Sequence, residues 1–222
     1  MSDYPRVIWR LSPSLRNNRR IALTFDDGPH PIITPQLLDL FDHHGVRATF
    51  FLVGDRVARW PELAERIAAA GHTIGSHGWA HRRDWWSGMR TLGDDLDRAE
   101  AVLDHYLGAP KLFRPPYGAL GPTWYRAARK RGYTIALWNA TVRDWTTGDT
   151  NRIERALRRK ATPGRIVLVH ECRATDGVGY VHTVDAVRRY LQYAESQAYR
   201  FISLRDALAE SVLESPITDS SE

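Results

Sequence analysis

Short runs of apolar residues recur along the chain, and segments with a helical repeat of apolar positions separate them. A nearly continuous apolar run is typical of a parallel strand that is buried on both faces. Four such runs lie at residues 21–25, 48–53, 135–138 and 166–169. Weaker strand candidates lie at residues 72–76, 111–114 and 200–204. The pattern therefore predicts a sheet of about six or seven parallel strands.

Helical repeats fill the intervals between these runs, at residues 35–44, 57–70, 92–107, 123–131, 152–160 and 184–196. Several of them end at a glycine that suits a left-handed helix cap, as at Gly45 and Gly71. Alternation of strands and helices within one chain predicts an α/β fold. Because no G-x-G-x-x-G sequence follows the first strand, nothing supports a dinucleotide-binding sheet. The choice is between an open doubly wound sheet and a closed or nearly closed barrel.

The polar residues that follow the apolar runs favour the barrel. Acids, histidines, an arginine and a tyrosine come directly after five of the runs; these residues are Asp26, Asp27, His77, His81, Arg114, Tyr117, Asp144 and His170. In a β/α barrel the C-terminal ends of the strands form the face on which active sites are built. We therefore predict a (β/α) barrel of about six or seven parallel strands, with the active site at the C-terminal ends of the strands.

Composition indicates one globular domain of ordinary make-up. The 222 residues are 43% hydrophobic and 26% charged. We divide the chain into an N-terminal extension (1–19), a catalytic domain (20–209) and a flexible acidic tail (210–222). No apolar run is long enough to span a membrane, and residues 1–20 lack the apolar segment of a signal peptide. We therefore expect a cytoplasmic protein, or an extracellular or envelope protein if another route exports it. Cys172 is the only cysteine and excludes an internal disulfide.

The net charge of +5 is unevenly spread, because residues 210–222 contain four acids and no base. Such a basic body could favour anionic polymers, including nucleic acid, acidic glycan or a phosphate-rich envelope polymer. Most of the positive charge is arginine distributed over helical segments, which favours solvated helix faces instead. No nucleic-acid-binding motif accompanies the charge, so we predict no specific binding of nucleic acid.

His77 and His81 are the strongest sign of a metal site. They lie four residues apart, so one helical turn would place both imidazoles on the same side. An acid with two imidazoles suits Zn²⁺ or a similar divalent ion. Asp27 is the candidate third ligand, because adjacent acids on an extended strand point to opposite sides and only one of Asp26 and Asp27 is expected to bind. Asp26 would then take a proton from a metal-activated water.

Five short motifs together resemble the polysaccharide deacetylase family, also called the NodB-homology group or carbohydrate esterase family 4. They are Thr24–His30 (TFDDGPH), His77–His81 (HGWAH), Arg114–Gly118 (RPPYG), Asp144–Trp145 and Leu168–His170. They occur in the family's order and extend over most of the predicted domain. The family fold is a distorted barrel with fewer strands than the eight of a TIM barrel, in agreement with the strand pattern.

The resemblance also implies a role for each motif residue. Asp26 would be the general base, and Asp27, His77 and His81 the metal ligands. Arg114 would orient Asp26, and the Tyr117 backbone N–H would stabilise the oxyanion. His170 would be the general acid, held by Asp144. Four further residues would contact substrate: Trp145 and Leu168 around the acetyl methyl, Pro116 within the third motif, and Trp79 at the rim.

The expected function is metal-dependent removal of N-acetyl groups from N-acetylglucosamine-containing oligo- or polysaccharides, resembling chitin or peptidoglycan. A metal-bound water would attack the amide, with Asp26 as base and His170 as acid. Zinc is the preferred metal, with Co²⁺ or Mn²⁺ as alternatives. The alternative functions are an acetyl esterase acting on acetylated polysaccharide and a non-catalytic glycan-binding module. The sequence does not indicate an oligomeric state.

Two residues depart from the family motifs. Gly78 stands where the family usually has Ser or Thr, and that hydroxyl helps to fix the metal-binding loop. We expect its absence to loosen the loop or weaken metal retention. Thr141 replaces the first Asp of the usual fourth motif, so the substrate preference of the family does not transfer directly to this chain. Outside the motifs, Trp85 and Trp86 are either a sugar-stacking platform or packing residues of a long loop.

Overall fold

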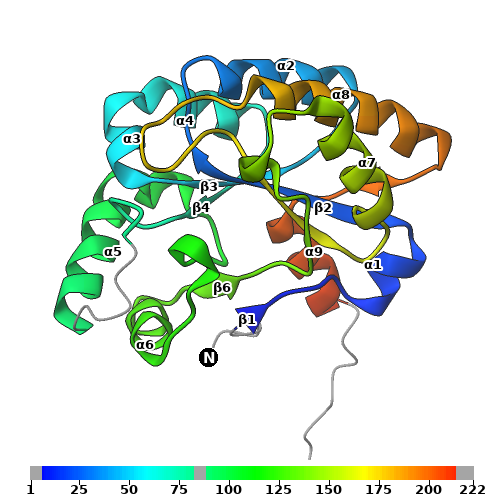
Figure 1. Ribbon diagram of the computed structural model, residues 1–222. Helices are drawn as coiled ribbons and strands as arrows, with labels where there is room; N and C mark the ends of the chain where they lie inside the picture. The colour runs from blue at the N-terminus through cyan, green and yellow to red at the C-terminus, as the bar shows by residue number, and fades with distance from the viewer. Residues whose placement is uncertain (1–6, 83–88, 214–222) are drawn as a thin grey trace, which may run out of the picture.

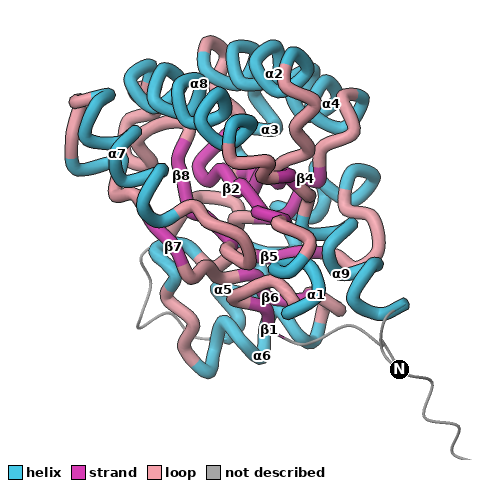
Figure 2. Tube along the Cα trace, turned by 90° about the vertical axis from the view of Figure 1, so that its right-hand side faces the viewer, coloured by secondary structure: helices cyan, strands magenta, loops and turns pink. Residues whose placement is uncertain are grey.

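The computed structural model describes residues 7–82 and 89–213. Its centre is a sheet in which every paired strand runs parallel to its neighbour (Figures 1 and 2). The strands are β1 (Val7–Ile8), β2 (Arg20–Gly28), β3 (Thr49–Leu52), β4 (Thr73–Ser76), β5 (Leu112–Phe113), β6 (Thr134–Ala136), β7 (Ala140–Thr141), β8 (Ile166–His170) and β9 (Arg200–Phe201). Their order is β1-β6-β5-β4-β3-β2-β8-β7, and β9 pairs with β2.

This arrangement confirms the predicted α/β fold with a distorted barrel. All seven predicted strands are present, and the described residues add two short ones, β1 and β7, at the two ends of the sheet order. A two-residue strand leaves too short an apolar run to be distinguished from a loop in the sequence. No pairing joins β1 to β7 within the described residues, so the barrel is open between them.

Nine α-helices are described, and most of them lie outside the sheet (Figure 2). They are α1 (Pro13–Asn17), α2 (Ile33–His43), α3 (Gly54–Arg59), α4 (Pro61–Ala69), α5 (Met89–Leu103), α6 (Pro122–Lys130), α7 (Thr150–Lys160), α8 (Val181–Ser196) and α9 (Leu204–Leu213). The helix predicted at 57–70 is divided into α3 and α4. Trp60, between them, has φ −135° and ψ 61° because the proline that follows disfavours a helical conformation there. None of the helices within residues 7–82 and 89–213 combines the length and the apolar character that crossing a membrane requires.

Alternate residues of the strands belong to two different apolar cores. Leu23 and Phe25 of β2 are in the larger core, which also contains residues of the outer helices. Ala22 is in a smaller core with Phe51 of β3 and Leu204 of α9. Figure 1 accordingly shows α2 and α8 on one side of β2 and α9 on the other. The smaller core therefore fills the inside of the barrel below the C-terminal ends of the strands.

Segments on both sides of the predicted 20–209 domain are built into this structure. Within the predicted extension, β1 pairs with β6 and Leu15 of α1 is buried. At the other end, α9 continues past residue 209 to Leu213. Residues 214–222 of the predicted acidic tail lie outside the described part of the chain.

Truncation of Leu204 tests the contribution of α9 to the inner core. Leu204 is fully buried, so Leu204→Ala leaves a cavity and should lower the free energy of unfolding by about 2–5 kcal/mol. Val181→Ala at an exposed position of α8 is the control and should change it by less than about 0.5 kcal/mol. Chemical denaturation measures both; equal effects would show that α9 does not stabilise the core.

Candidate active site

A pocket of about 550 Å³ lies at the C-terminal ends of the strands. Parallel pairing brings its residues together: Asp26 of β2 is in register with His170 of β8. The other lining residues are Asp27, His77, His81, Tyr117, Gly118, Trp138, Trp145, Leu168, Arg173, Ala174, Thr175 and Tyr180. The structure thus brings eight of the twelve predicted site residues to the wall of one pocket.

Both adjacent acids, Asp26 and Asp27, reach this pocket, and this corrects the expectation that they point to opposite sides of β2. The backbone of Asp27 has φ 69°, in the left-handed region. The register between β2 and β3 also shifts between Asp26 and Gly28. This β-bulge ends the strict alternation of side chains along the strand. The base and the metal ligand proposed from the motif can therefore share one site.

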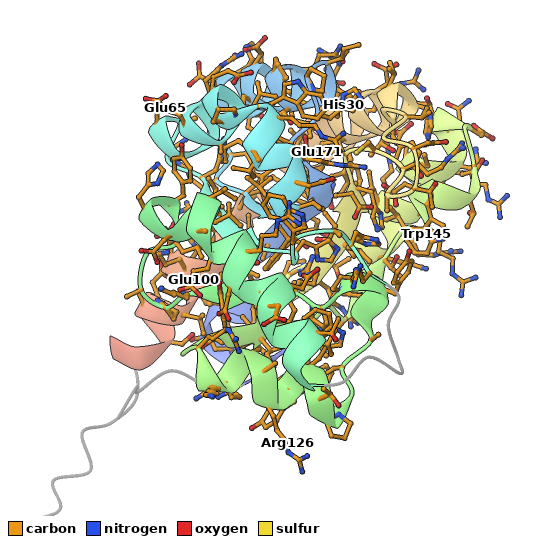
Figure 3. The ribbon with its side chains drawn as sticks, turned by 90° about the vertical axis from the view of Figure 1, so that its left-hand side faces the viewer. His30, Glu65, Glu100, Arg126, Trp145 and Glu171 are labelled. Atoms are coloured by element: carbon orange, nitrogen blue, oxygen red, sulfur yellow. The ribbon has the colours of Figure 1, made fainter. Side chains whose placement is uncertain are left out.

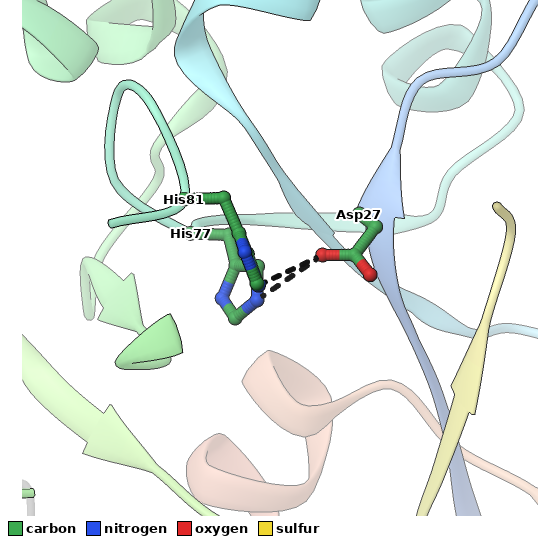
Figure 4. A group of neighbouring side chains, drawn as sticks. All are labelled: Asp27, His77 and His81. Atoms are coloured by element: carbon green, nitrogen blue, oxygen red, sulfur yellow. Dashed lines mark ion pairs between the residues drawn. The ribbon is translucent and has the colours of Figure 1, made fainter. Parts of the chain in front are cut away.

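Asp27, His77 and His81 face one another at the edge of the pocket (Figure 4). Asp27 Oδ1 lies 3.6 Å from His77 Nε2 and 3.1 Å from His81 Nε2. One ligand atom from each residue can be chosen so that all lie within 4.8 Å of one another. The ligand atoms of a tetrahedral zinc ion lie roughly 3.4 Å apart when the bonds are about 2.1 Å long. The three residues therefore fit one divalent ion.

The surroundings of the Asp27 carboxylate also indicate a cation site. Its Oδ1 is buried and has no hydrogen-bond partner in the described part of the chain, because the nearby His81 nitrogen does not meet hydrogen-bond geometry. Burial raises the pKa of Asp27 to about 7. A buried polar atom without a partner is costly, and a cation bound at this oxygen would remove that cost.

Both histidines are held in the neutral form that can bind a metal. His77 Nδ1 lies 2.7 Å from the Arg114 carbonyl oxygen, which can only accept, so Nδ1 carries the hydrogen. The lone pair is then on Nε2, which faces Asp27. Burial lowers the pKa values of His77 and His81 to about 3. Neither imidazole therefore needs to lose a proton near neutral pH before it binds a cation.

Arg114 crosses the inside of the barrel beneath the pocket and is fully buried. Its Nη1 donates to Asp26 Oδ1 at 2.7 Å and to Thr24 Oγ1 at 2.8 Å. The other guanidinium nitrogens donate to the carbonyl oxygens of Ala136 and Leu137. With all of these contacts made, the guanidinium has one orientation, and it holds the Asp26 carboxylate in place. Asp26 Oδ2 lies 3.8 Å from His77 Nε2, beside the proposed metal position.

His170 of β8, the strand beside β2, forms a second charged pair with the buried Asp144. One Asp144 oxygen lies 3.0 Å from His170 Nδ1, and the other accepts from the His170 backbone N–H at 2.7 Å. Burial lowers the pKa of His170, but the carboxylates of Asp144, Asp27 and Asp26 together raise it by more, so that it reaches about 9. The Trp145 ring packs edge-on against the imidazole, with 4.9 Å between ring centroids. The proton of His170 is thereby retained at neutral pH, with Nε2 left to face the pocket.

The predicted substrate contacts divide into two groups. Trp145 and Leu168 line the pocket, as does Tyr117, whose ring packs against His81. Trp79 and Pro116 are not among the described residues that line it. Trp79 lies under the Arg98 guanidinium and against Gly54, and Pro116 is buried. Trp85 and Trp86 lie outside the described residues.

Gly78 is accompanied by a compensating contact that the sequence pattern does not reveal. Asp95 of α5 is buried, and its Oδ2 accepts a hydrogen bond from the Trp79 backbone N–H at 2.7 Å. The same oxygen lies 2.7 Å from the position that a Cβ at Gly78 would occupy. Gly78 has φ 77°, so a side chain there would also be strained. The carboxylate thus fixes the loop between His77 and His81 from outside the motif.

Arg56 and Glu171 are further supporting residues outside the predicted set. The Arg56 guanidinium donates to the Asp27 carbonyl oxygen and, at 3.1 Å, to the carbonyl oxygens of Arg173 and Ala174. Glu171 is buried beneath Gly28, where burial raises its pKa to about 8, and it accepts from Thr34. Arg56 lies in a segment whose charge pattern resembles an ordinary solvated surface, so no signal in the sequence distinguishes it. Glu171 directly follows His170 at the end of a buried strand, and that position is the signal that could have identified it.

His30 and Cys172 have structural contacts instead of a place in the pocket. His30 Nδ1 accepts from the backbone N–H groups of Ile32 and Ile33 at the start of α2, near Glu171 (Figure 3). The Cys172 thiol is buried and donates to the Asp27 carbonyl oxygen at 3.2 Å. Burial raises its pKa to about 12, which leaves the thiol protonated and unreactive.

Comparison with known proteins agrees with this geometry. The family model described as polysaccharide deacetylase matches residues 15–136. A peptidoglycan-N-acetylglucosamine deacetylase of Bacillus cereus is 34% identical over 91% of this chain and 92% of the relative. A chitooligosaccharide deacetylase of Bradyrhizobium is 35% identical over 69% of this chain and 71% of the relative. A crystal structure of the Bc1960 peptidoglycan N-acetylglucosamine deacetylase superimposes with a TM-score of 0.82 at 28% identity, and covers 93% of this chain and 94% of that one.

Removal of the Asp95 carboxylate should weaken metal binding without touching a proposed ligand. Asp95→Ala leaves the Trp79 N–H without this acceptor and frees the loop between His77 and His81, so we expect affinity for Zn²⁺ to fall about 10- to 100-fold. Asp95→Asn keeps an acceptor oxygen, so its affinity for Zn²⁺ should fall by much less. Competition with a chromogenic chelator measures the affinity. Asp94→Ala at the exposed neighbouring position is the control, and equal losses for Asp94 and Asp95 would contradict the assignment.

Proposed function

The chain belongs to the polysaccharide deacetylase family, and from this premise we propose that it hydrolyses the N-acetyl groups of N-acetylglucosamine-containing oligo- or polysaccharides. The observation that carries the proposal is the arrangement of one pocket: a three-residue metal site, a carboxylate and a carboxylate-paired histidine. Relatives that act on peptidoglycan and on chitooligosaccharides support the amide of an acetylated amino sugar as the bond that is cleaved.

Hydrolysis of an acetamide has three chemical requirements. Water must become nucleophilic, the carbonyl must be polarised, and the amine leaving group must be protonated. A divalent cation held by Asp27, His77 and His81 would supply Lewis-acid chemistry for the first two. Zinc is the metal that we propose, with Co²⁺ or Mn²⁺ as alternatives, because one carboxylate and two imidazoles suit it.

Asp26 is the residue that we assign to take the proton from the attacking water. Its Oδ1 is engaged by Arg114, so Oδ2 is the oxygen turned towards the metal ligands and the pocket. The charge-assisted hydrogen bond from the guanidinium keeps the carboxylate in one position. Arg114 therefore acts through Asp26 and does not need to contact the substrate.

His170 is the residue that we assign to protonate the departing amine. It lines the pocket beside Asp26, on the neighbouring strand, and the carboxylates of Asp144, Asp27 and Asp26 keep it protonated at neutral pH. Trp145 and Leu168 lie beside it and offer an apolar surface for the acetyl methyl group. The backbone N–H of Tyr117, a residue that lines the pocket, is assigned to stabilise the oxyanion.

The pair of His170 and Asp144 predicts a shift in the pH profile of the reaction. Because the acid must be protonated, kcat should fall as the pH rises through the pKa of His170. Asp144→Asn removes the carboxylate that raises this pKa, so the alkaline limb should move to lower pH, and kcat at neutral pH should fall by at least about 10-fold. The pH dependence of kcat in the two enzymes tests this prediction. An unchanged alkaline limb would show that another group is the acid.

A substrate panel tests the proposed function. The zinc-loaded enzyme should release acetate from N-acetylglucosamine oligomers or peptidoglycan fragments, and much less from acetylated xylan. Faster release from acetylated xylan would make the protein an esterase. If no sample releases acetate although zinc is bound, the pocket binds glycan without hydrolysing it, and the proposal is wrong.

A further inference from the structure

A strongly basic groove lies beside the active-site pocket, between α7 and the end of β7 with the residues that follow it. It has a volume of about 660 Å³. Its cationic lining residues are Arg143, Arg152, Arg155, Arg159 and Lys160. Thr141, Val142, Thr146 and Ala156 complete the lining, so no acid and no aromatic residue is among its described walls.

The spacing of the arginines on α7 directs them to this one side. Arg152, Arg155 and Arg159 follow a three-, then four-residue interval, which places them on a single stripe of the helix. The one acid of the helix, Glu154, lies off the stripe and pairs with Arg158 at 2.6 Å. The helix therefore separates a neutralised face from a face that presents positive charge alone.

Among the described residues, the cations of the groove have no carboxylate partner. No ion pair within residues 7–82 and 89–213 involves any of the four arginines. The Lys160 ammonium donates to the Thr141 carbonyl oxygen at 2.8 Å, which holds it at the groove wall. Like charges gathered in one hollow repel one another. A bound anion would relieve that repulsion, and a guanidinium fork matches a carboxylate or phosphate with two hydrogen bonds.

The groove connects to the active site through shared residues. A second hollow of about 450 Å³ shares Thr141, Arg159 and Lys160 with it. Trp138 lines both this hollow and the active-site pocket. On the other side, Arg143 and Thr146 of the groove flank Trp145 in sequence, and Trp145 also lines the pocket. The pocket, the second hollow and the basic groove are therefore neighbours on the surface of the molecule.

We propose that this groove binds anionic groups, carboxylate or phosphate, of the same glycan whose N-acetyl sugar occupies the pocket. The inference rests on the proposed function, since it names the class of glycan as acidic. An acidic glycan is favoured over nucleic acid because the groove has no aromatic side chain on which bases could stack. The groove then makes the enzyme selective, because it lowers KM for acidic substrates and leaves KM for neutral substrates unchanged.

Charge reversal on α7 with a matched control tests the proposal. The test variant is Arg155→Glu/Arg159→Glu, and the control is Arg126→Glu/Lys130→Glu on α6. Both pairs are exposed, lie four residues apart on a helix and change the charge equally. Figure 3 shows Arg126 far from Trp145, which lines the active-site pocket. Arg155→Gln/Arg159→Gln is a milder second variant in case the reversal unfolds the chain.

The substrates are an uncharged N-acetylglucosamine tetramer, a peptidoglycan fragment with free peptide carboxylates, and a fragment bearing a phosphodiester polymer. For at least one anionic substrate, we expect the test variant to raise KM about 10-fold at 50 mM salt, with kcat unchanged within two-fold. The effect should shrink at 0.5 M salt because the charges are screened. KM for the neutral tetramer should stay within two-fold. The anionic substrate that responds identifies the group as carboxylate or phosphate.

Several results would overturn the proposal. They are an equal rise of KM for neutral and acidic substrates, no rise for either acidic substrate, and the same rise in the α6 control. Loss of duplex DNA binding in the test variant, with acidic glycans unaffected, would assign the groove to nucleic acid. If the unsubstituted enzyme releases no acetate at all, the proposed function fails separately. Calorimetric binding of the two acidic fragments, reduced in the test variant alone, would then still support the groove.

Discussion

The site depends on one turn of the backbone, at Asp27 near the end of β2. A left-handed conformation at a residue other than glycine costs about 1–2 kcal/mol, although aspartate tolerates it better than most residues. Its surroundings hold it there: the Arg56 guanidinium and the Cys172 thiol both donate to the Asp27 carbonyl oxygen. Without this turn, alternation along the strand would direct Asp26 and Asp27 to opposite sides. With it, a base and a metal ligand from consecutive positions meet in one pocket.

Buried charges around this turn are paired, and each pair fixes the position of a proposed catalytic group. Arg114 is buried below Asp26 and donates to its carboxylate, which holds that side chain in one position. Asp144 is buried behind His170 and stabilises the imidazolium form. Asp26 and His170 are in register on the adjacent strands β2 and β8, so the two pairs bring their carboxylate and imidazole to neighbouring positions of the pocket. Burial of the metal-ligand histidines has the opposite effect and keeps them neutral. One barrel end therefore offers a base, an acid and two neutral imidazoles near neutral pH.

Much of the fold and of the candidate site could be predicted from the sequence. Parallel strands buried on both faces leave continuous apolar runs, as at β3 and β8, and the residues after such runs must meet at one end of a barrel. The local turn at Asp27 was not accessible, because period-two alternation assumes a regular strand. The role of Asp95 could not be predicted either, because it lies in an amphipathic helix with several other acids. Only the packing of α5 against the loop between His77 and His81 shows its contact with the Trp79 N–H.

The central claim is that Asp27 binds the metal while its neighbour Asp26 performs the proton transfer. Metal content and acetate release, measured side by side in Asp26→Asn and Asp27→Asn, test it most directly. We predict that Asp26→Asn retains about one equivalent of zinc but loses at least about 1,000-fold in kcat, and that Asp27→Asn loses the zinc as well. If Asp26→Asn also loses the metal, or keeps most of its activity, the division of roles between the two carboxylates is wrong.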